Sequence, residues 1–282
     1  MIFNSDRIGQ ICNLLRRTGE TELLPRFQSQ IPNRVVEKTS SFDVVSDADQ
    51  AAEHLICNEL AAMFPGALLV GEETSGNDPD AIAKLGHADI AFLIDPIDGT
   101  KNFTSGVPLF GSMIAGLLNG EIVFAAIHDP ICNETSLALR GEGAWTLRAD
   151  DTEIPLRVAR PCAPEQMNIV AGTNFLPPHL RPVVQKNLPN FSMNFWLRCA
   201  AHEYRIAASG HCELLVYNKL MPWDHAAGWL LHREAGGHSA HFDGTEYLPT
   251  HTTGGLICAP DRESWLAARD SLFGGHPDAA TG

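Results

Sequence analysis

The spacing of apolar residues predicts alternating helices and strands along most of the chain. A first helix runs toward Pro25, and a second begins at Ser46 or Asp47 and ends before Pro65-Gly66. The second helix has a single apolar face, which consists of Ala52, Leu55, Ile56, Leu60 and Met63. Such a helix packs that face on a core and leaves the other face to water.

Short apolar runs predict strands in the first half of the chain. Residues 90–94 are continuously apolar, as in a buried strand, and Asn119-Gly120 separates two further runs, as in a tight hairpin. The expected strands are 67–71, 90–94, 111–118, 121–128 and 134–139, with a short helix at 78–85.

The second half of the chain alternates between the two kinds of element. We expect strands at 168–171, 213–217 and 255–259, and helices near 178–187 and at 200–209, 224–235 and 261–272. The two halves, residues 1–148 and 149–282, are expected to pack together as a mixed α/β protein.

Composition narrows the class of protein. Of the 282 residues, 44% are hydrophobic and 19% are charged, which supplies enough apolar material for a large core. The net charge is −14 and Lys and Arg are scattered, so we expect no nucleic-acid partner. Seven widely spaced cysteines without a CxxC pair predict reduced thiols in the cytoplasm, and no apolar run is long enough to predict a membrane span.

Acidic residues gather at four places, two of them directly after predicted strands. The acids are Glu72-Glu73, Asp95 with Asp98, Asp49, and Asp224. Active sites of α/β proteins lie beyond the carboxyl ends of strands, and carboxylate oxygens are the ligands that Mg²⁺ prefers. The alternative for Asp49 and Asp224 is a simple interaction with the dipole at a helix N-terminus.

The string DPIDGT at residues 95–100 is the most informative of these signals. Pro96 fixes its backbone and predicts a sharp turn that points both carboxylates and the Ile97 carbonyl at one place. Gly99 lets the backbone come close to an anion, which the amides of Gly99 and Thr100 can face. Carboxylates beside such amides suit a metal-dependent hydrolase of phosphate esters.

The motifs together resemble those of the inositol monophosphatase family. The matching blocks are DPIDGT (95–100), GEE (71–73), WDHAAG (223–228), Lys38 with DVVSDAD (43–49), and EAGG (234–237). The resemblance implies a layered αβαβα sandwich, usually in homodimers. It also implies a lithium-sensitive, Mg²⁺-dependent phosphate monoester hydrolase that uses water activated by metal.

The resemblance also assigns roles to single residues. One Mg²⁺ would be held by Glu72, Asp95 and the Ile97 carbonyl, and a second by Asp95, Asp98 and Asp224. A third, weaker Mg²⁺ would lie near Glu72. Thr100, hydrogen-bonded to Asp49, would orient the attacking water together with Glu72. The amides of Gly99 and Thr100 would bind phosphate, and Lys38 and Glu73 would surround the ligands.

The substrate pocket departs from the family pattern. Tyr217 stands where inositol-phosphate hydrolases carry a Glu, and Arg198-Cys199-Ala200 stands where the family has Gly-[Ser/Thr]-Ala. Arg198 either meets a second anionic group of the substrate or pairs with a surface acid. We expect Arg198, Ala200 and Tyr217 to line the pocket, with His202 and Glu203 as further candidates.

The expected substrate is therefore a small phosphate ester of a polyol or sugar-like alcohol, of the inositol-1-phosphate type. The alternatives are histidinol phosphate, a 3′-phosphoadenosine nucleotide, or a regulatory protein that keeps the metal site and binds a partner. We expect the tryptophans Trp145, Trp196 and Trp265 to fill packing sites, and His238 and His241 to lie in a polar loop.

Overall fold

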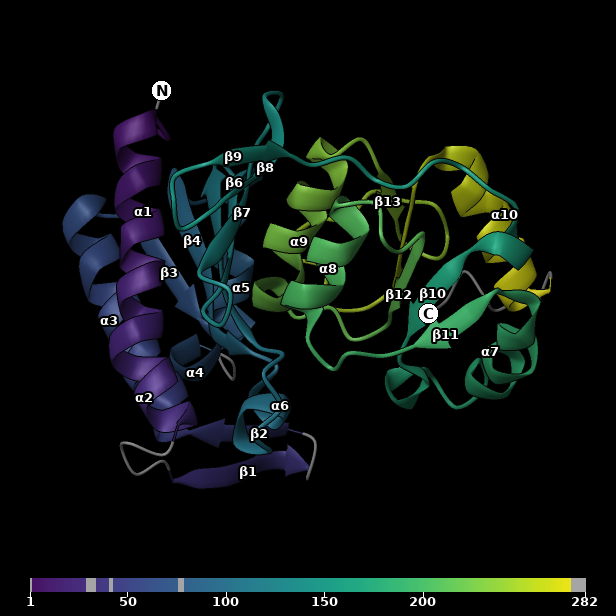
Figure 1. The fold of residues 1–282 in the computed structure, drawn as a ribbon, viewed down its shortest axis with the longest axis horizontal. Coiled ribbons are helices and arrows are strands. Elements are labelled where there is room, and N and C mark those ends of the chain that lie inside the picture. Colours follow the sequence, from purple (N-terminus) through teal and green to yellow (C-terminus); the bar gives the residue numbers. More distant parts are fainter. Residues whose placement is uncertain (1, 29–33, 41–42, 76–78, 275–282) are drawn as a thin grey trace.

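The computed structural model describes residues 2–28, 34–40, 43–75 and 79–274. These residues form five layers (Figure 1). Helices, a seven-stranded sheet, helices, a five-stranded sheet and helices follow one another across the molecule. The expected αβαβα sandwich is confirmed.

The first helical layer consists of α1 (Ser5–Thr18) and α3 (Asp47–Met63). A π-helical turn (Gly19–Leu23) joins α1 to α2 (Leu24–Phe27), so the first helix reaches Pro25 as expected and continues past it. The layer packs on the outer face of the first sheet through a cluster that includes Phe3, Ile11, Leu15, Ile56, Leu60, Phe92 and Phe124.

The first sheet has the order β3-β4-β5-β6-β7-β8-β9. Its strands are β3 (Leu68–Gly71), β4 (Ile90–Asp98), β5 (Gly111–Leu118), β6 (Glu121–Asp129), β7 (Glu134–Leu139), β8 (Gly143–Leu147) and β9 (Glu153–Pro155). Only β3 and β4 are parallel; the later strands pair antiparallel in chain order. The expected strands are present, whereas β8 and β9 were not predicted, because both are short.

Short elements surround the carboxyl end of β4. They are the ribbon of β1 (Val35–Ser40) and β2 (Asp43–Ser46) and the helices α4 (Glu72–Ser75) and α6 (Thr100–Thr104). Helix α5 (Pro79–Lys84) instead precedes the amino end of β4 in the chain. The predicted helix at 78–85 corresponds to α5, and its first residue lies outside the described part of the chain.

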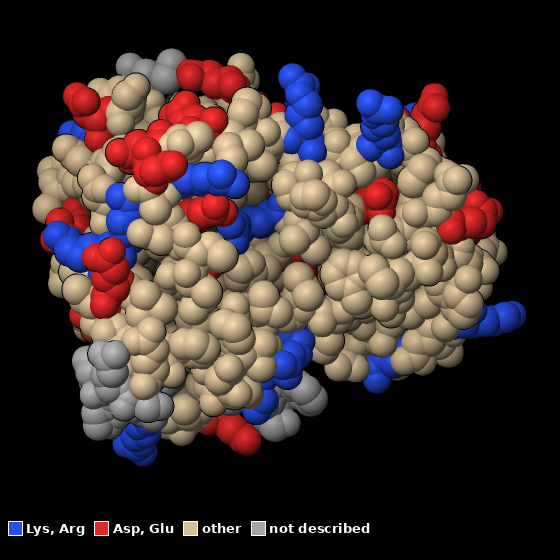
Figure 2. Space-filling view, viewed as in Figure 1, with Lys and Arg blue, Asp and Glu red and all other residues tan. Residues whose placement is uncertain are grey.

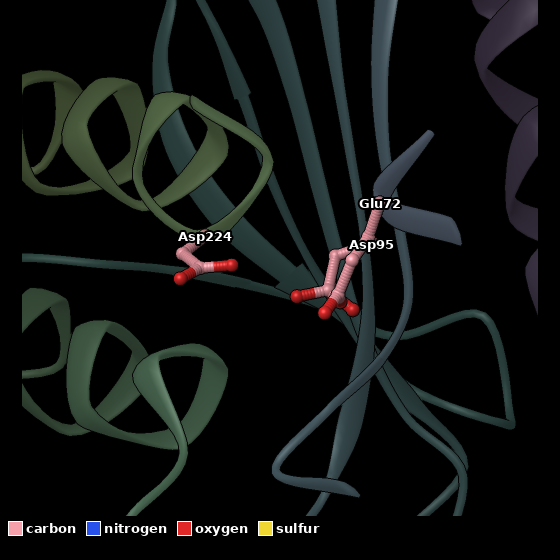
Figure 3. A group of neighbouring side chains, drawn as sticks. All are labelled: Glu72, Asp95 and Asp224. Carbon is pink, nitrogen blue, oxygen red and sulfur yellow. The ribbon is translucent and has the colours of Figure 1, made fainter. Parts of the chain in front are cut away.

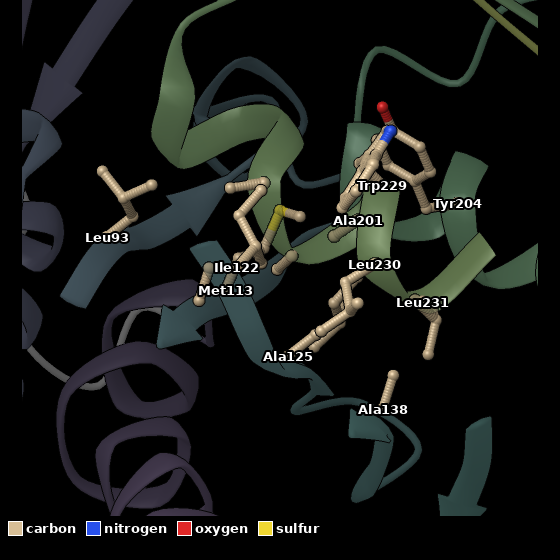
Figure 4. Packing of buried hydrophobic residues seen from close by; sticks show 14 of the residues in the cluster. Leu93, Met113, Ile122, Ala125, Ala138, Ala201, Tyr204, Trp229, Leu230 and Leu231 are labelled. Carbon is tan, nitrogen blue, oxygen red and sulfur yellow. The ribbon is translucent and has the colours of Figure 1, made fainter. Parts of the chain in front are cut away.

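The middle layer consists of α8 (Ala200–Ala208) and α9 (Pro222–Glu234), which lie between the two sheets (Figure 1). Their apolar side chains meet those of the first sheet in one cluster, in which Leu230 and Leu231 lie near Ala125 and Ala138 (Figure 4). Gly228 of α9 faces the ring of Tyr204 of α8, and a Cβ atom on Gly228 would overlap that ring. The two helices therefore approach closely at this glycine.

The second sheet has the order β11-β10-β12-β14-β13. Its strands are β10 (Asn168–Ala171), β11 (Met193–Phe195), β12 (Leu214–Tyr217), β13 (His238–Ala240) and β14 (Leu256–Ala259). The last layer consists of α7 (Arg181–Asn187) and α10 (Arg262–Phe273), with short 3₁₀ turns at Pro164–Gln166, Thr173–Phe175 and Leu188–Asn190. An apolar cluster that includes Leu180, Val184, Trp265 and Leu272 joins these helices to the sheet.

Two local predictions were wrong. The chain does not leave the sheet at Asp95, because β4 continues to Asp98 with an irregular register between those residues. His238 belongs to β13 and not to a loop, whereas His241 lies in the loop that follows the strand, where it is buried and contacts the carbonyl of Gly255. The sequence did not predict β13 because its residues are mostly polar and its pairing partner, β14, is distant in the chain.

The surface carries both signs of charge. On the face drawn in Figure 2, Lys and Arg side chains stand mostly singly among other residues. None of the helices in the described ranges combines the length and the apolar character that crossing a membrane requires. All seven cysteines are free thiols.

The close contact at Gly228 predicts opposite effects for two glycine substitutions. Gly228→Ala should lower the free energy of unfolding by about 1–3 kcal/mol, because the added methyl group must displace the Tyr204 ring. Gly9→Ala, in α1, meets no atom within 4 Å and should raise it by about 0.5–1 kcal/mol. Urea unfolding of both variants measures the difference, and equal effects would contradict this account of the middle layer.

Candidate functional site

Three carboxylates from separate elements converge beyond the end of β4. Glu72 begins α4, Asp95 lies in β4, and Asp224 lies in the first turn of α9; one oxygen of each lies within 4.8 Å of the others. Figure 3 shows Glu72 and Asp95 side by side, with Asp224 facing them from the middle layer. The described residues thus contain an acidic group that could hold a metal ion.

The register of two parallel strands brings the first two acids together. Gly71 of β3 pairs with Ile94 of β4, so the next residues, Glu72 and Asp95, stand side by side. Glu72 begins α4 at the end of β3, whereas Asp95 remains in β4 and pairs with Met113 of β5. Pro96 then offers no amide for pairing, and its carbonyl accepts a hydrogen bond from Ser112 Oγ at 2.7 Å. The strand end is therefore fixed, although its ladder is irregular.

Two of the three acids, Asp95 and Asp224, are held in an environment that disfavours their charge. Burial raises the pKa of Asp95 and Asp224 well above the usual range, and the nearby Glu72 and Asp98 carboxylates raise both further. Asp95 Oδ1 is buried and has no hydrogen-bond partner among the described residues. An orphaned carboxylate oxygen beside like charges fits a site for a hard divalent cation, which takes oxygen ligands.

The Asp98 carboxylate contacts the start of α8 in the middle layer and lies near the other acids. Its Oδ2 atom accepts a hydrogen bond from the Ala201 amide at 2.5 Å and one from the Cys199 thiol at 3.0 Å. Burial raises the pKa of Asp98 to about 6, while these two donors act in the opposite direction. Asp98 lines the same pocket, but it is not in the 4.8 Å group.

Thr100 and Asp49 are in contact, as expected. The Thr100 hydroxyl lies 3.1 Å from Asp49 Oδ1 and 2.8 Å from the Ile97 carbonyl oxygen. Asp49 is buried, and its Oδ2 atom accepts hydrogen bonds from the amide and the hydroxyl of Ser46, which forms a capping box for α3. Asp49 therefore both caps a helix and reaches the end of β4.

The residue before Thr100 must be a glycine in this geometry. Gly99 has a φ of +86°, and an added Cβ would lie 2.9 Å from the carbonyl oxygen of Leu109. This conformation turns the chain from β4 into α6, so the amides of Gly99 and Thr100 follow the strand directly.

Glu53 is a buried acid that the sequence analysis missed. Its two carboxylate oxygens accept hydrogen bonds from the amides of Glu73 and Thr74, at 2.7 and 2.8 Å. Glu53 lies four residues after Asp49 and so on the same face of α3, which is the signal that could have revealed it. It fixes the backbone that carries Glu72 and Glu73; the side chain of Lys38 lies outside the described part of the chain.

A pocket of about 230 Å³ opens above the acids. Arg198, Ala200, Tyr217 and Glu203 line it, whereas His202 does not and instead contacts the Phe110 carbonyl at 3.1 Å. Trp196 packs against the core as expected and also lines this pocket. Further lining residues, which local patterns do not reveal, are Lys101, Gly172, Phe175, Asn218 and Lys219.

Comparison with known proteins identifies the family. The model of the inositol monophosphatase family matches residues 10–271. The chain is 30% identical over 241 residues to a fructose-1,6-bisphosphatase/inositol-1-monophosphatase of Thermotoga maritima, covering 86% of this chain and 87% of that one. It is 32% identical to the Nus factor SuhB of Haemophilus influenzae, covering 78% and 79%.

A third relative and two solved structures agree with this result. A histidinol-phosphatase of Chlorobaculum parvum is 34% identical over 68% of this chain and 70% of its own. The extragenic suppressor protein SuhB of Bartonella henselae has a TM-score of 0.82 at 28% identity, covering 95% of this chain and 98% of that one. An IMPase of Thermotoga maritima has a TM-score of 0.77 at 26% identity, with the same coverage. The chain belongs to the inositol monophosphatase family and is a phosphoric monoester hydrolase.

Proposed function

We propose that this protein is a Mg²⁺-dependent hydrolase of a small phosphate ester of a polyol or sugar-like alcohol, of the inositol-1-phosphate type. The observation that carries the proposal is the meeting of Glu72, Asp95 and Asp224 within 4.8 Å at the floor of a pocket. The pocket has room for a small alcohol, and relatives are named inositol monophosphatases.

The family resemblance implies which residues would hold the cations, and the group formed by Glu72, Asp95 and Asp224 supports it. Glu72, Asp95 and the Ile97 carbonyl would hold one Mg²⁺, and Asp95, Asp98 and Asp224 a second, with a third near Glu72. Bound cations would supply positive charge against the phosphate and would acidify a water molecule.

The chain itself would position the water and the phosphate. The Thr100 hydroxyl has one hydrogen; when it is donated to Asp49 Oδ1, a lone pair of the oxygen is left to accept a hydrogen bond from the attacking water. Glu72 would accept the water's second hydrogen bond and so orient it, and the amides of Gly99 and Thr100 would hold the phosphate oxygens. Glu53 and Glu73 would keep the backbone of Glu72 in place.

The pocket residues Tyr217 and Glu203 would determine which alcohol the site accepts. Tyr217 lies against His225, with ring centres 4.6 Å apart, and stands beside the Glu203 carboxyl. Tyr217 and Glu203 would contact the alcohol, in place of the single Glu that inositol-phosphate hydrolases carry. A panel of phosphate esters ranked by kcat/KM tests this, and it includes inositol 1-phosphate, histidinol phosphate and a 3′-phosphoadenosine nucleotide.

The alternative from another class is a partner-binding protein that keeps the metal site, which the relative named as a Nus factor supports. No phosphate release from any ester at any Mg²⁺ concentration, by folded protein, would favour this alternative. We further propose a homodimer, inhibition by lithium and a cytoplasmic location; the free thiols support the last of these.

Replacement of the central carboxylate should abolish turnover. Asp95→Asn removes a negative charge and a ligand oxygen, so kcat should fall by about three orders of magnitude, since metal-borne charge stabilisation contributes several kcal/mol. Phosphate release measures kcat, and circular dichroism checks that the fold is kept. Asp270→Asn, at a side chain that is 73% exposed, is the control with the same change in charge. Undiminished turnover by Asp95→Asn would contradict the proposed site.

Magnesium should stabilise the fold more at high pH than at low pH. Burial raises the pKa of Asp49 to about 7 and of Asp98 to about 6, from 3.8. The unfolded chain loses these protons near pH 4 and the folded chain only near pH 6–7, so these groups lower stability as the pH rises through that window. A cation binds the deprotonated carboxylates and offsets this loss.

The quantity to measure is the increment in the free energy of unfolding, which is its value in Mg²⁺ minus its value in a chelator. This difference reports on the carboxylates that bind the cation. Buried His128 and His232 have pKa values lowered to about 4 and follow the opposite trend, but neither lines the pocket, so we expect them to act equally with and without Mg²⁺. The increment should grow from pH 5 to pH 8 and shrink in Asp95→Asn. An increment that is independent of pH would count against a carboxylate site.

A further inference from the structure

Arg198 has an unusual backbone conformation for its residue type. Its φ is +57°, in the left-handed region that disfavours residues with a Cβ atom. The other non-glycine residues with positive φ in the described ranges are Asn119, Asn133 and Asp151, whose short polar side chains tolerate this region. The long side chain of arginine does not form the local hydrogen bonds that let Asn and Asp tolerate this region, so the surrounding structure must impose the conformation.

Three contacts hold the turn that contains Arg198. The carboxylate of Glu203 accepts a hydrogen bond from the Leu197 amide at 3.0 Å, and Asn102 Nδ2 donates to the Leu197 carbonyl at 2.8 Å. On the other side, the Cys199 thiol donates to Asp98 at 3.0 Å. The turn is therefore fixed to the end of β4, and a backbone conformation that is over-determined in this way is typical of functional positions.

The Arg198 side chain lines the pocket and lacks an acidic partner. It is half-buried, and within the described residues it has neither an ion pair nor a hydrogen bond. Lys101 and Lys219 line the same pocket and, in the part of the chain that the structure describes, also have no ion pair. The alternative that Arg198 pairs with a surface acid has no support, because no such acid lies within 4 Å among those residues.

We propose that Arg198 binds a second anionic group of the substrate, so that the preferred ester carries a carboxylate or a second phosphate besides the phosphate that is released. The planar guanidinium matches the paired oxygens of either group, and Lys219, which also lines the pocket, adds positive charge. The proposal rests on the proposed function for the position of the released phosphate. It also disfavours esters with an ammonium group, such as histidinol phosphate, which the same cations would repel.

Matched pairs of esters test the preference. Glycerol 3-phosphate and 3-phosphoglycerate differ only in one carboxylate, and fructose 6-phosphate and fructose 1,6-bisphosphate differ only in one phosphate. The kcat/KM of the more anionic member of at least one pair should be about tenfold higher, as expected for a charged hydrogen bond. In Arg198→Gly and in Arg198→Asn, residues that accept a positive φ, this ratio should fall to about one. An effect in the glycerol pair identifies a carboxylate as the second anionic group, and an effect in the fructose pair identifies a phosphate.

Asp151→Gly is the matched control, because it makes the same backbone change at a φ of +63° outside the pocket. It should leave both ratios unchanged. Ratios near one in the unmodified protein, or ratios that persist in both Arg198 variants, would overturn the proposal.

Binding without turnover separates this proposal from the proposed function. Calorimetry in Mg²⁺ compares ω-phosphonoalkanoates with alkylphosphonates of the same chain length, neither of which can be hydrolysed as an ester. The carboxylate should tighten binding about tenfold at one chain length, and both Arg198 variants should lose the gain. Equal affinities at every length would overturn the role of Arg198, even if esters are hydrolysed. If no ester is hydrolysed, the proposed function fails and the calorimetric comparison still decides the role of Arg198.

Discussion

Mutual repulsion among buried carboxylates is the constraint on which the rest of this structure depends. The Glu72 carboxylate raises the pKa of both Asp95 and Asp224, and Asp224 raises that of Asp95, so these side chains would separate if their backbones were free to move. They stay together because each is attached to a different rigid element: a strand end, a clamped turn and the first turn of a buried helix. The fold supplies the force that opposes the repulsion, and a cation would remove its cause.

Helix α3 has a double task in this arrangement. Asp49 reaches the Thr100 hydroxyl, and Glu53, one turn later, holds the amides that follow Glu72. Both side chains belong to one rigid helix, whose apolar face is packed on the first sheet. The positions of Thr100 and Glu72 are therefore coupled, although they lie on different segments of the chain.

Local patterns predicted most of the elements and the acids of the site, because period, turn residues and the run from an apolar strand into DPIDGT are all written in adjacent residues. They did not predict β13, the pocket role of Trp196 or the clamp by Glu53. Each of these depends on partners from distant segments: β13 on its pairing with β14, Trp196 on the opposite pocket wall, and Glu53 on the turn after β3. The positive φ of Arg198 likewise could not be predicted from the sequence, since arginine is not one of the residues that favour this conformation in turns.

The pocket takes its walls from different layers: Glu72 and Asp95 stand on the first sheet, whereas Tyr217 ends a strand of the second sheet and Arg198 precedes α8. The helices α8 and α9 separate the two sheets and also supply lining residues, so their packing contributes to the distance between these walls. A larger or smaller residue where α8 and α9 touch, as at Gly228, would reset that gap without altering any side chain that meets the ester. Members of one family could in this way come to accept alcohols of different length while their acidic motifs stay the same.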